Sequence, residues 1–231
     1  MRGTPLSCKP SPRRSLFAVV ALIAASASPA AAQWDLGIYA GPTRTTLSGS
    51  YVENSIHTWG FTAGVFFERY FSPRWSAEAG INIISQKGGF EVVSASQPMQ
   101  YDYRFNYIEV PLAINYIVPF ANDAWDFRGF AGATAAFGSS CDVKPSTQFS
   151  FDTSCAAGFP GGEFEKFDLL INLGIGADRV FEGGSGFGFD VRYGLGTQNT
   201  LGEAADNGQS ALNRELDIRF RVFLPMSGPR Q

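Results

Sequence analysis

The sequence predicts an all-β fold: an eight-stranded up-and-down antiparallel transmembrane β-barrel with long external loops. Three observations favour it. Apolar and polar residues alternate along eight stretches, as in strands whose two faces meet different surroundings. The connections between these stretches are alternately long and short, and the four tryptophans fall near strand ends. These features are typical of a barrel in the outer membrane of a bacterium.

The first 32 residues are expected to be a secretory signal peptide. A basic start ends at Arg14, an apolar run follows from Leu16 to about Ala25, and small residues precede Gln33. The run is shorter than the roughly 20 residues that a spanning helix needs, so cleavage after Ala32 is expected. Residues 33–231 then form a single barrel domain.

Composition excludes several classes of partner and cofactor. The chain has 18 Lys plus Arg against 21 Asp plus Glu, a formal net charge of −3, and no basic run after the signal. Nucleic acid is therefore not expected as a partner. The only histidine, His57, makes a histidine-rich metal site impossible within one chain. Glycines such as those at 183–186 complete no nucleotide-binding motif, and no cofactor is expected.

Alternation defines most strands and leaves one ambiguous. The first strand sets Leu36 and Ile38 opposite Asp35 and Tyr39, and the second and third follow the same rule. The fifth strand is too rich in alanine and glycine for its faces to be assigned. The eight expected strands span residues 34–41, 58–70, 75–83, 107–116, 126–137, 167–176, 187–195 and 215–224.

The fourth strand, YIEVPLAINY, carries Glu109 and Pro111 on the face opposite its aliphatic residues. A proline has no N–H to give to a neighbouring strand. A bulge or a water-bridged gap in the ladder is therefore expected at Pro111.

Connection lengths indicate which end of the barrel faces the periplasm. The links after the second, fourth and sixth strands are short, whereas residues 42–57, 85–103, 138–163 and 196–213 are expected to form long loops. Outer-membrane barrels have short periplasmic turns and long external loops in this order.

The polar face is expected to line the lumen, because eight strands enclose a space that side chains just fill. Charges there must be paired to be tolerated, and Glu109 is expected within reach of Arg192, Arg219 or Arg221. A soluble sheet with these charges in water, such as a lipocalin-like carrier, is the structural alternative. The expected lumen charge network comprises Glu68, Glu78, Glu109, Asp168, Asp190, Arg192, Asp217, Arg219 and Arg221.

Tryptophans and cysteines give two further expectations. Trp34, Trp75 and Trp125 fall at periplasmic strand ends and Trp59 at the opposite rim, as in two aromatic girdles. Cys141 and Cys155 are expected to form a disulfide that closes part of an external loop, since the chain is exported and no other thiol follows the signal. Two free thiols are the alternative.

The strand containing Tyr107-Ile108-Glu109-Val110-Pro111-Leu112, the later Phe167-Asp168-Leu169 and the strand Asp190-Val191-Arg192-Tyr193-Gly194 resemble the outer-membrane β-barrel family that includes PorT-like proteins. The resemblance implies the fold and an outer-membrane location. PorT is associated with protein secretion, so it also implies a secretion-accessory role as one option.

The expected function is that of a non-enzymatic outer-membrane barrel, structural, adhesive or secretion-accessory through its external loops. The expected partners are membrane lipid and lipopolysaccharide, the barrel-assembly machinery, and a surface or secretion-system protein. A small channel and a lipid A-modifying enzyme are the alternatives; the enzyme would use His57 near Ser55, but no aligned base and orienting group can be identified.

Overall fold

The computed structural model describes residues 33–50, 54–94, 97–120, 125–145, 153–154, 166–199 and 210–226. Within these ranges, no helix is long and apolar enough to cross a membrane. The described residues belong to one unit, Gln33–Gln231. The predicted signal peptide, residues 1–32, lies outside the described residues and stays a prediction.

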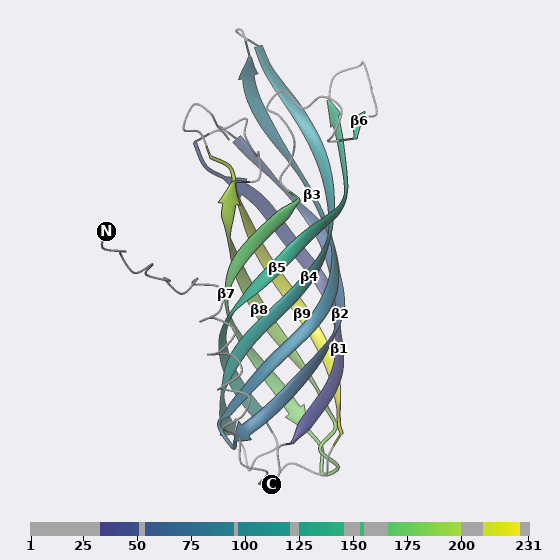
Figure 1. The fold of residues 1–231 in the computed structure, drawn as a ribbon, viewed down its shortest axis with the longest axis vertical. Coiled ribbons are helices and arrows are strands. Elements are labelled where there is room, and N and C mark those ends of the chain that lie inside the picture. Colours follow the sequence, from purple (N-terminus) through teal and green to yellow (C-terminus); the bar gives the residue numbers. More distant parts are fainter. Residues whose placement is uncertain are drawn as a thin grey trace, which may run out of the picture. The chain divides into compact units, whose positions relative to one another are not determined.

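The described part of the chain forms eight long strands and one two-residue strand, β6 (Figure 1). Each long strand pairs antiparallel with the next, β5 pairs with β7, and β1 pairs with β9, so the sheet closes. The predicted closed up-and-down barrel is confirmed. The strands are β1 (Trp34–Ser48), β2 (Asn54–Ser72), β3 (Trp75–Ser94), β4 (Gln97–Phe120), β5 (Trp125–Pro145), β6 (Thr153–Ser154), β7 (Phe167–Val180), β8 (Gly186–Asn199) and β9 (Leu212–Pro225).

Side chains alternate between the lumen and the outer surface, because successive residues of a strand point to opposite faces. On β1, Asp35 and Tyr39 are buried inside, whereas Ile38 is 61% exposed outside. Ile83 and Ile175 expose 63% and 69% in the same way. A broad apolar surface therefore surrounds a polar interior, which is the inverse of a soluble barrel.

The faces of β5, which the sequence leaves open, are set by its neighbours. Arg128, Phe130 and Thr134 are buried in the lumen, whereas Phe127 and Ala131 are exposed outside. The outward positions between the two end phenylalanines, Phe127 and Phe137, hold only glycine and alanine. Small residues on the outer face weaken the apolar alternation and make the faces hard to read from sequence.

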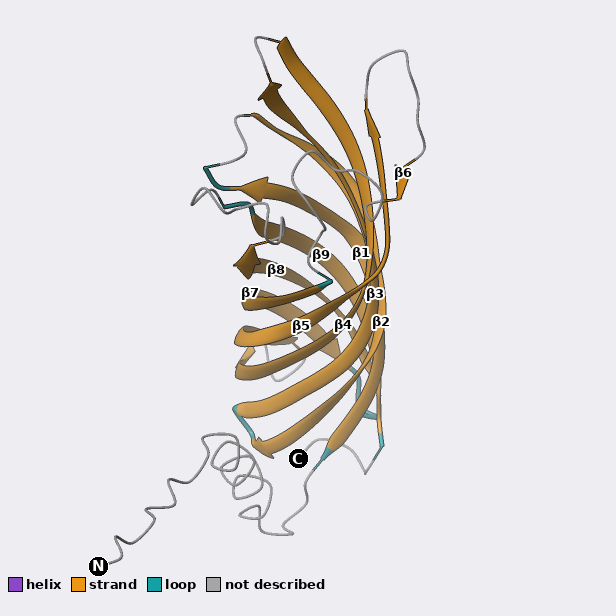
Figure 2. Cartoon of the chain, turned by 45° about the horizontal axis from the view of Figure 1, so that its top comes forward, coloured by secondary structure: helices purple, strands orange, loops and turns teal. Residues whose placement is uncertain are grey.

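The expected loops at 42–57 and 85–103 are largely strand in the structure, whereas most of the links expected at 138–163 and 196–213 lies outside the described residues and stays a prediction. β1 runs to Ser48 and β2 begins at Asn54, while β3 and β4 leave only residues 95 and 96 between them. β5 extends to Pro145. Parts of strands that project beyond the apolar outer surface of the barrel meet water on both faces. Apolar and polar residues need not alternate there, so the sequence of these parts resembles that of a loop. Figure 2 shows β3, β4 and β5 projecting past the other strands.

Pro111 does not cause a bulge. Its pairing with Thr134 of β5 continues the regular β4–β5 register. On the other side of β4, the β3–β4 ladder is interrupted between the pairs Ala79–Leu112 and Asn82–Glu109. These two pairs have the same register. The missing N–H of proline thus leaves a gap in the ladder without changing the register.

Compact turns join the strands at the end where β1 begins and β9 ends, which we call the lower end. The Ser72 hydroxyl accepts a hydrogen bond from the Trp75 N–H at 3.1 Å and so fixes the β2–β3 turn. In the β7–β8 turn, Gly184 has φ 81°, and its N–H donates to the Phe181 carbonyl at 2.8 Å. Glycine adopts this left-handed conformation without strain.

Candidate functional site in the barrel interior

The upper lumen is organised around one arginine. Arg192 of β8 places Nη2 2.6 Å from Asp217, 2.9 Å from Glu215 and 3.4 Å from Glu109. Its Nη1 also donates to the Thr134 hydroxyl at 3.3 Å. These four charged residues, Arg192, Glu109, Glu215 and Asp217, are called the Arg192 cluster below. All four are buried, so each charge depends on its neighbours rather than on water.

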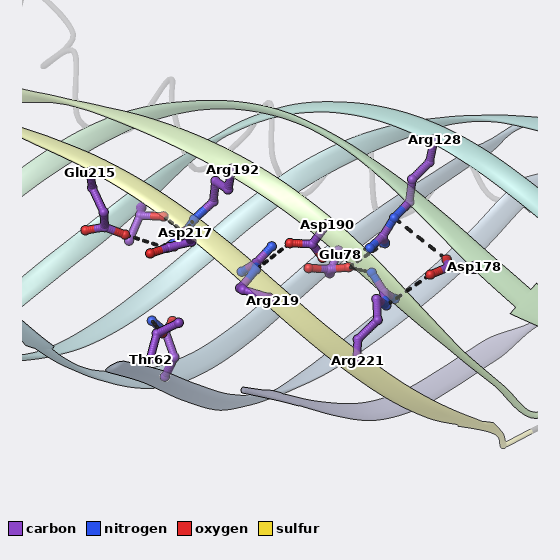
Figure 3. Close-up of polar contacts among 12 residues, drawn as sticks. Thr62, Glu78, Arg128, Asp178, Asp190, Arg192, Glu215, Asp217, Arg219 and Arg221 are labelled. Carbon is purple, nitrogen blue, oxygen red and sulfur yellow. Dashed lines mark hydrogen bonds and ion pairs between the residues drawn. The ribbon is translucent and has the colours of Figure 1, made fainter. Parts of the chain in front are cut away.

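The lower lumen contains a larger network of three arginines. Arg221 binds Glu68 at 2.9 Å and Glu78 at 3.0 Å. Arg128 lies 2.8 Å from Asp190, and Arg219 lies 2.6 Å from another oxygen of that carboxylate. Together with Asp178, 3.7 Å from both Arg128 and Arg221, these residues form the Arg221 cluster. Figure 3 labels every member of this cluster except Glu68.

Neutral polar side chains connect the carboxylates to the sheet. Asn82 donates to Glu109 at 2.8 Å, and Gln86 donates to Glu215 at 3.0 Å. In the lower lumen, Asn115 donates to Glu68 at 3.0 Å. Buried charges lose several kcal/mol of hydration each, and such hydrogen bonds help to offset that loss. The interior is therefore a network joined to several strands rather than a set of isolated pairs.

Aromatic rings share the lumen with the charges. Tyr39, Phe66, Phe130 and Phe223 are buried. The Arg221 guanidinium lies 4.0 Å from the centre of the Phe66 ring. Cation–π contact of this kind stabilises an arginine that has lost water. Rings and guanidinium groups thus fill the lower lumen together.

The aromatic rings fit because glycines lie opposite them. Gly37 pairs with Phe66 across β1 and β2, and Gly174 pairs with Phe130 across β5 and β7. A Cβ at Gly174 would overlap the Phe130 ring. These glycines are therefore required by the packing of the lumen.

All nine residues of the predicted charge network are buried in the barrel interior. Eight of them lie in the two clusters. Asp168 lies apart, near the upper end of β7, where it accepts a hydrogen bond from the Gln198 N–H at 3.2 Å.

Sequence reasoning missed Arg128, Asp178 and Glu215 as members of the network. Arg128 lies on the strand whose faces could not be assigned, yet it is the one cation between Asp126 and Phe137. Asp178 lies two residues beyond the end of the expected strand 167–176. It is on the same face of that strand as Asp168, because the two positions differ by an even number of residues. Extending the pattern of that strand by two residues would have found Asp178. Glu215 lies within the expected strand 215–224 and on the same face as Asp217, so the alternation already marked it as a polar-face residue.

The tryptophans lie on or near the outer surface. Trp34, Trp59 and Trp75 expose 39%, 56% and 44%, while Trp125 is half-buried. Trp34, Trp75 and Trp125 begin β1, β3 and β5 at the lower end. The Arg69 guanidinium lies 5.2 Å from the Trp34 ring, and Arg179 contacts Trp125 in the same way at 5.6 Å.

The remaining candidate residues lie partly outside the described ranges. Cys141 is in β5 opposite Phe105, but Cys155 is not among the described residues, so the disulfide stays a prediction. His57 pairs with Gly88 through the backbone of β2 and β3. No group of three or more His, Cys, Asp or Glu residues in the described part of the chain is arranged to hold a metal ion.

Comparison with known proteins agrees with this architecture. A family model described as "Outer membrane protein beta-barrel domain" matches residues 24–202. No curated protein matches the chain. The narrower resemblance to PorT-like proteins remains a prediction.

Several solved outer-membrane proteins are similar to this chain at low sequence identity. Ail of Yersinia pestis, solved in complex with the heparin analogue sucrose octasulfate, is 15% identical over 82% of this chain and 99% of its own, with a TM-score of 0.40. Neisserial surface protein A is 10% identical over 81% and 96%, with a TM-score of 0.43. OprG of Pseudomonas aeruginosa is 14% identical over 82% and 95%, with a TM-score of 0.47.

Proposed function

Because this chain belongs to the outer membrane protein beta-barrel domain family, we propose that it is a non-enzymatic outer-membrane protein that acts through its outer end. Its role is structural, adhesive or secretion-accessory. The chain lies in the outer membrane, with the short turns of the lower end on the periplasmic side and the projecting strands outside. Membrane lipid and lipopolysaccharide surround it, and the barrel-assembly machinery inserts it.

The filled lumen is the observation that carries this proposal. Arg192 reaches acids from β4 and β9, and Arg221 reaches acids from β2 and β3, so ion pairs cross the interior at two levels. Phe66 and Phe223, which expose 1% and 0%, occupy the space between the charges of the lower level. A path for hydrated solutes would require these groups to separate, which favours an external role over a channel.

Conductance tests the distinction between an external role and a small channel. The purified chain is reconstituted in planar bilayers at neutral pH. We expect no steady, reproducible conductance. Regular steps of one size that depend on added protein would instead support a channel.

The outer end offers a surface for contacts. β4 pairs with β3 from Ser85–Asn106 to Ser94–Gln97 and with β5 from Asn106–Ser140 to Tyr101–Pro145, beyond the apolar outer surface of the barrel (Figure 2). A paired ribbon of this kind presents a more rigid surface than a loop of equal length, since its backbone hydrogen bonds are already made. It therefore supports an adhesive or secretion-accessory role.

Shortening this ribbon tests the external role. Residues 88–103 are replaced by Asn-Gly, which closes a two-residue hairpin. Cells that express this variant should keep the barrel in the outer membrane but lose attachment to host-matrix surfaces or lose secreted cargo. Membrane integrity is measured as well, to test a structural role. If attachment, secretion and membrane integrity are all the same as with the intact chain, the external role is wrong.

The absence of enzymatic activity is tested at His57. Lipid A extracted from cells with the intact chain, with the His57→Ala variant and without the gene should have the same acylation pattern. A change that the intact chain produces and the variant does not would make the barrel an enzyme that modifies lipid A.

A further inference from the structure

The membrane-facing surface carries an apolar groove along β5. Its cavity of about 660 Å³ is lined by residues of β3, β4, β5, β7 and β8. That volume falls in the range of roughly 300–1,000 Å³ typical of ligand pockets. The groove is open to the outside of the barrel, so membrane lipid is the medium in contact with it.

The groove exists because β5 carries small outward residues between large ones. Gly129 pairs with Tyr116 of β4 and with Ile175 of β7. Ala131 likewise lies between Ile114 and Leu173. The two walls are therefore two strand spacings apart, or about 9.6 Å between their backbones. That leaves a width suited to one hydrocarbon chain.

Trp75 and Tyr116 mark the lower end of the groove, at the level of the periplasmic girdle. Their ring centres are 4.9 Å apart, and both rings are partly exposed on the outer face. Tryptophan and tyrosine at this level favour the boundary between hydrocarbon and headgroups.

Arg74 is an exposed cation next to this end of the groove, although it is not one of the residues that line it. It lies exposed in the β2–β3 turn, directly before Trp75. Its carbonyl accepts a hydrogen bond from the Ile117 N–H at 2.8 Å, which holds the turn beside Tyr116. A guanidinium at the headgroup level matches a lipid phosphate in charge and geometry.

We propose that this groove binds one acyl chain of a phospholipid from the periplasmic leaflet, with the phosphate of that lipid at Arg74. An acyl chain in the groove contacts two walls and a floor, whereas an acyl chain elsewhere in the membrane contacts the barrel on one side only. The lower end of the groove faces the leaflet that contains phospholipid, which excludes lipopolysaccharide as the source. The inference depends on the outer-membrane location and is independent of the external role proposed above.

Gly129→Phe fills the groove in a way that the barrel tolerates. A Cβ at Gly129 meets no atom within 4 Å, so the new side chain extends outward into the groove. Ala131→Phe repeats the test from the next position on the floor. Ala79→Phe is the matched control, because Ala79 is also an exposed outward residue but does not line the groove.

The experiment measures phospholipid that stays bound when the membrane-extracted chain is exchanged into mild detergent and analysed by native mass spectrometry. Phosphatidylethanolamine and phosphatidylglycerol are added at equal, known amounts. The intact chain and Ala79→Phe should each retain one phospholipid. Gly129→Phe and Ala131→Phe should retain about tenfold less, and Arg74→Gln should also retain less. Heat-dependent gel mobility checks that each variant is folded.

Equal retention by the intact chain and the two groove-filling variants would overturn the proposal. So would an intact chain that retains no phospholipid, or one that retains only lipopolysaccharide. Unchanged retention by Arg74→Gln would overturn the assignment of the phosphate to Arg74.

Discussion

Arg192 on β8 reaches across the barrel interior to Glu109 on β4, with Nη2 3.4 Å from Oε2. The glutamate that interrupts the apolar alternation of YIEVPLAINY is thus a buried member of a charge cluster. Both side chains are at most 3% exposed. The pair joins opposite walls of the barrel and helps to fill the lumen.

Removing the cation of the Arg192 cluster should destabilise the barrel. Arg192→Met leaves Glu109, Glu215 and Asp217 together in the lumen without their cation. Breaking a buried ion pair in this way costs roughly 3–5 kcal/mol. Urea unfolding of the chain in lipid vesicles should show a matching loss in the free energy of unfolding. Arg44→Met, at an exposed position, is the control and should change little; an Arg192→Met variant as stable as the intact chain would contradict the role of this cluster.

The packing of glycine against aromatic rings predicts a position-specific effect. Gly174→Val places a side chain into the Phe130 ring and should lower stability by about 1–3 kcal/mol. Gly129→Val lies on the neighbouring strand, where a Cβ meets no atom within 4 Å, and should be tolerated. The same unfolding assay compares the two.

A double variant separates this overlap from a general effect of valine. In the double variant Gly174→Val with Phe130→Ala, the aromatic ring that the valine side chain would overlap is absent. The loss should be smaller than the sum of the two single losses. Strict additivity would mean that the ring and the glycine act independently.

The closed barrel should resist detergent until it is boiled. Its strands pair around the full circumference through the β1–β9 ladder, so no edge is free to open. Membrane-extracted protein should therefore show different gel mobility before and after boiling. A single band at the same position in both samples would contradict a closed barrel.

Cys141 and Cys155 should be linked in the exported protein. A thiol-reactive label should modify neither residue unless a reductant is present. For a loop of this length, the entropy model gives roughly 3 kcal/mol of stabilisation relative to the open unfolded chain. Cys141→Ser should lower stability by up to that amount in oxidising buffer but not in reducing buffer. Labelling of both thiols without a reductant would show that they are free.

The sequence by itself determined the strand count, the two faces of most strands and the location in the outer membrane. It could do so because the direction of a side chain on a strand depends only on whether its position is odd or even, which is a local property of the backbone. Glu109, Arg192 and Asp217 are therefore predictable as residues of the polar face.

Tertiary structure alone decided which charges meet. Glu109 and Arg192 are 83 residues apart in sequence, and they come together because closure of the barrel brings β4 and β8 to opposite sides of a narrow lumen. The faces of β5 were settled in the same way, since only pairing with β4 and β7 places Arg128 inside. The strand ends also needed the structure: beyond the membrane both faces of a strand meet water, so no alternation in the sequence marks where the strand stops.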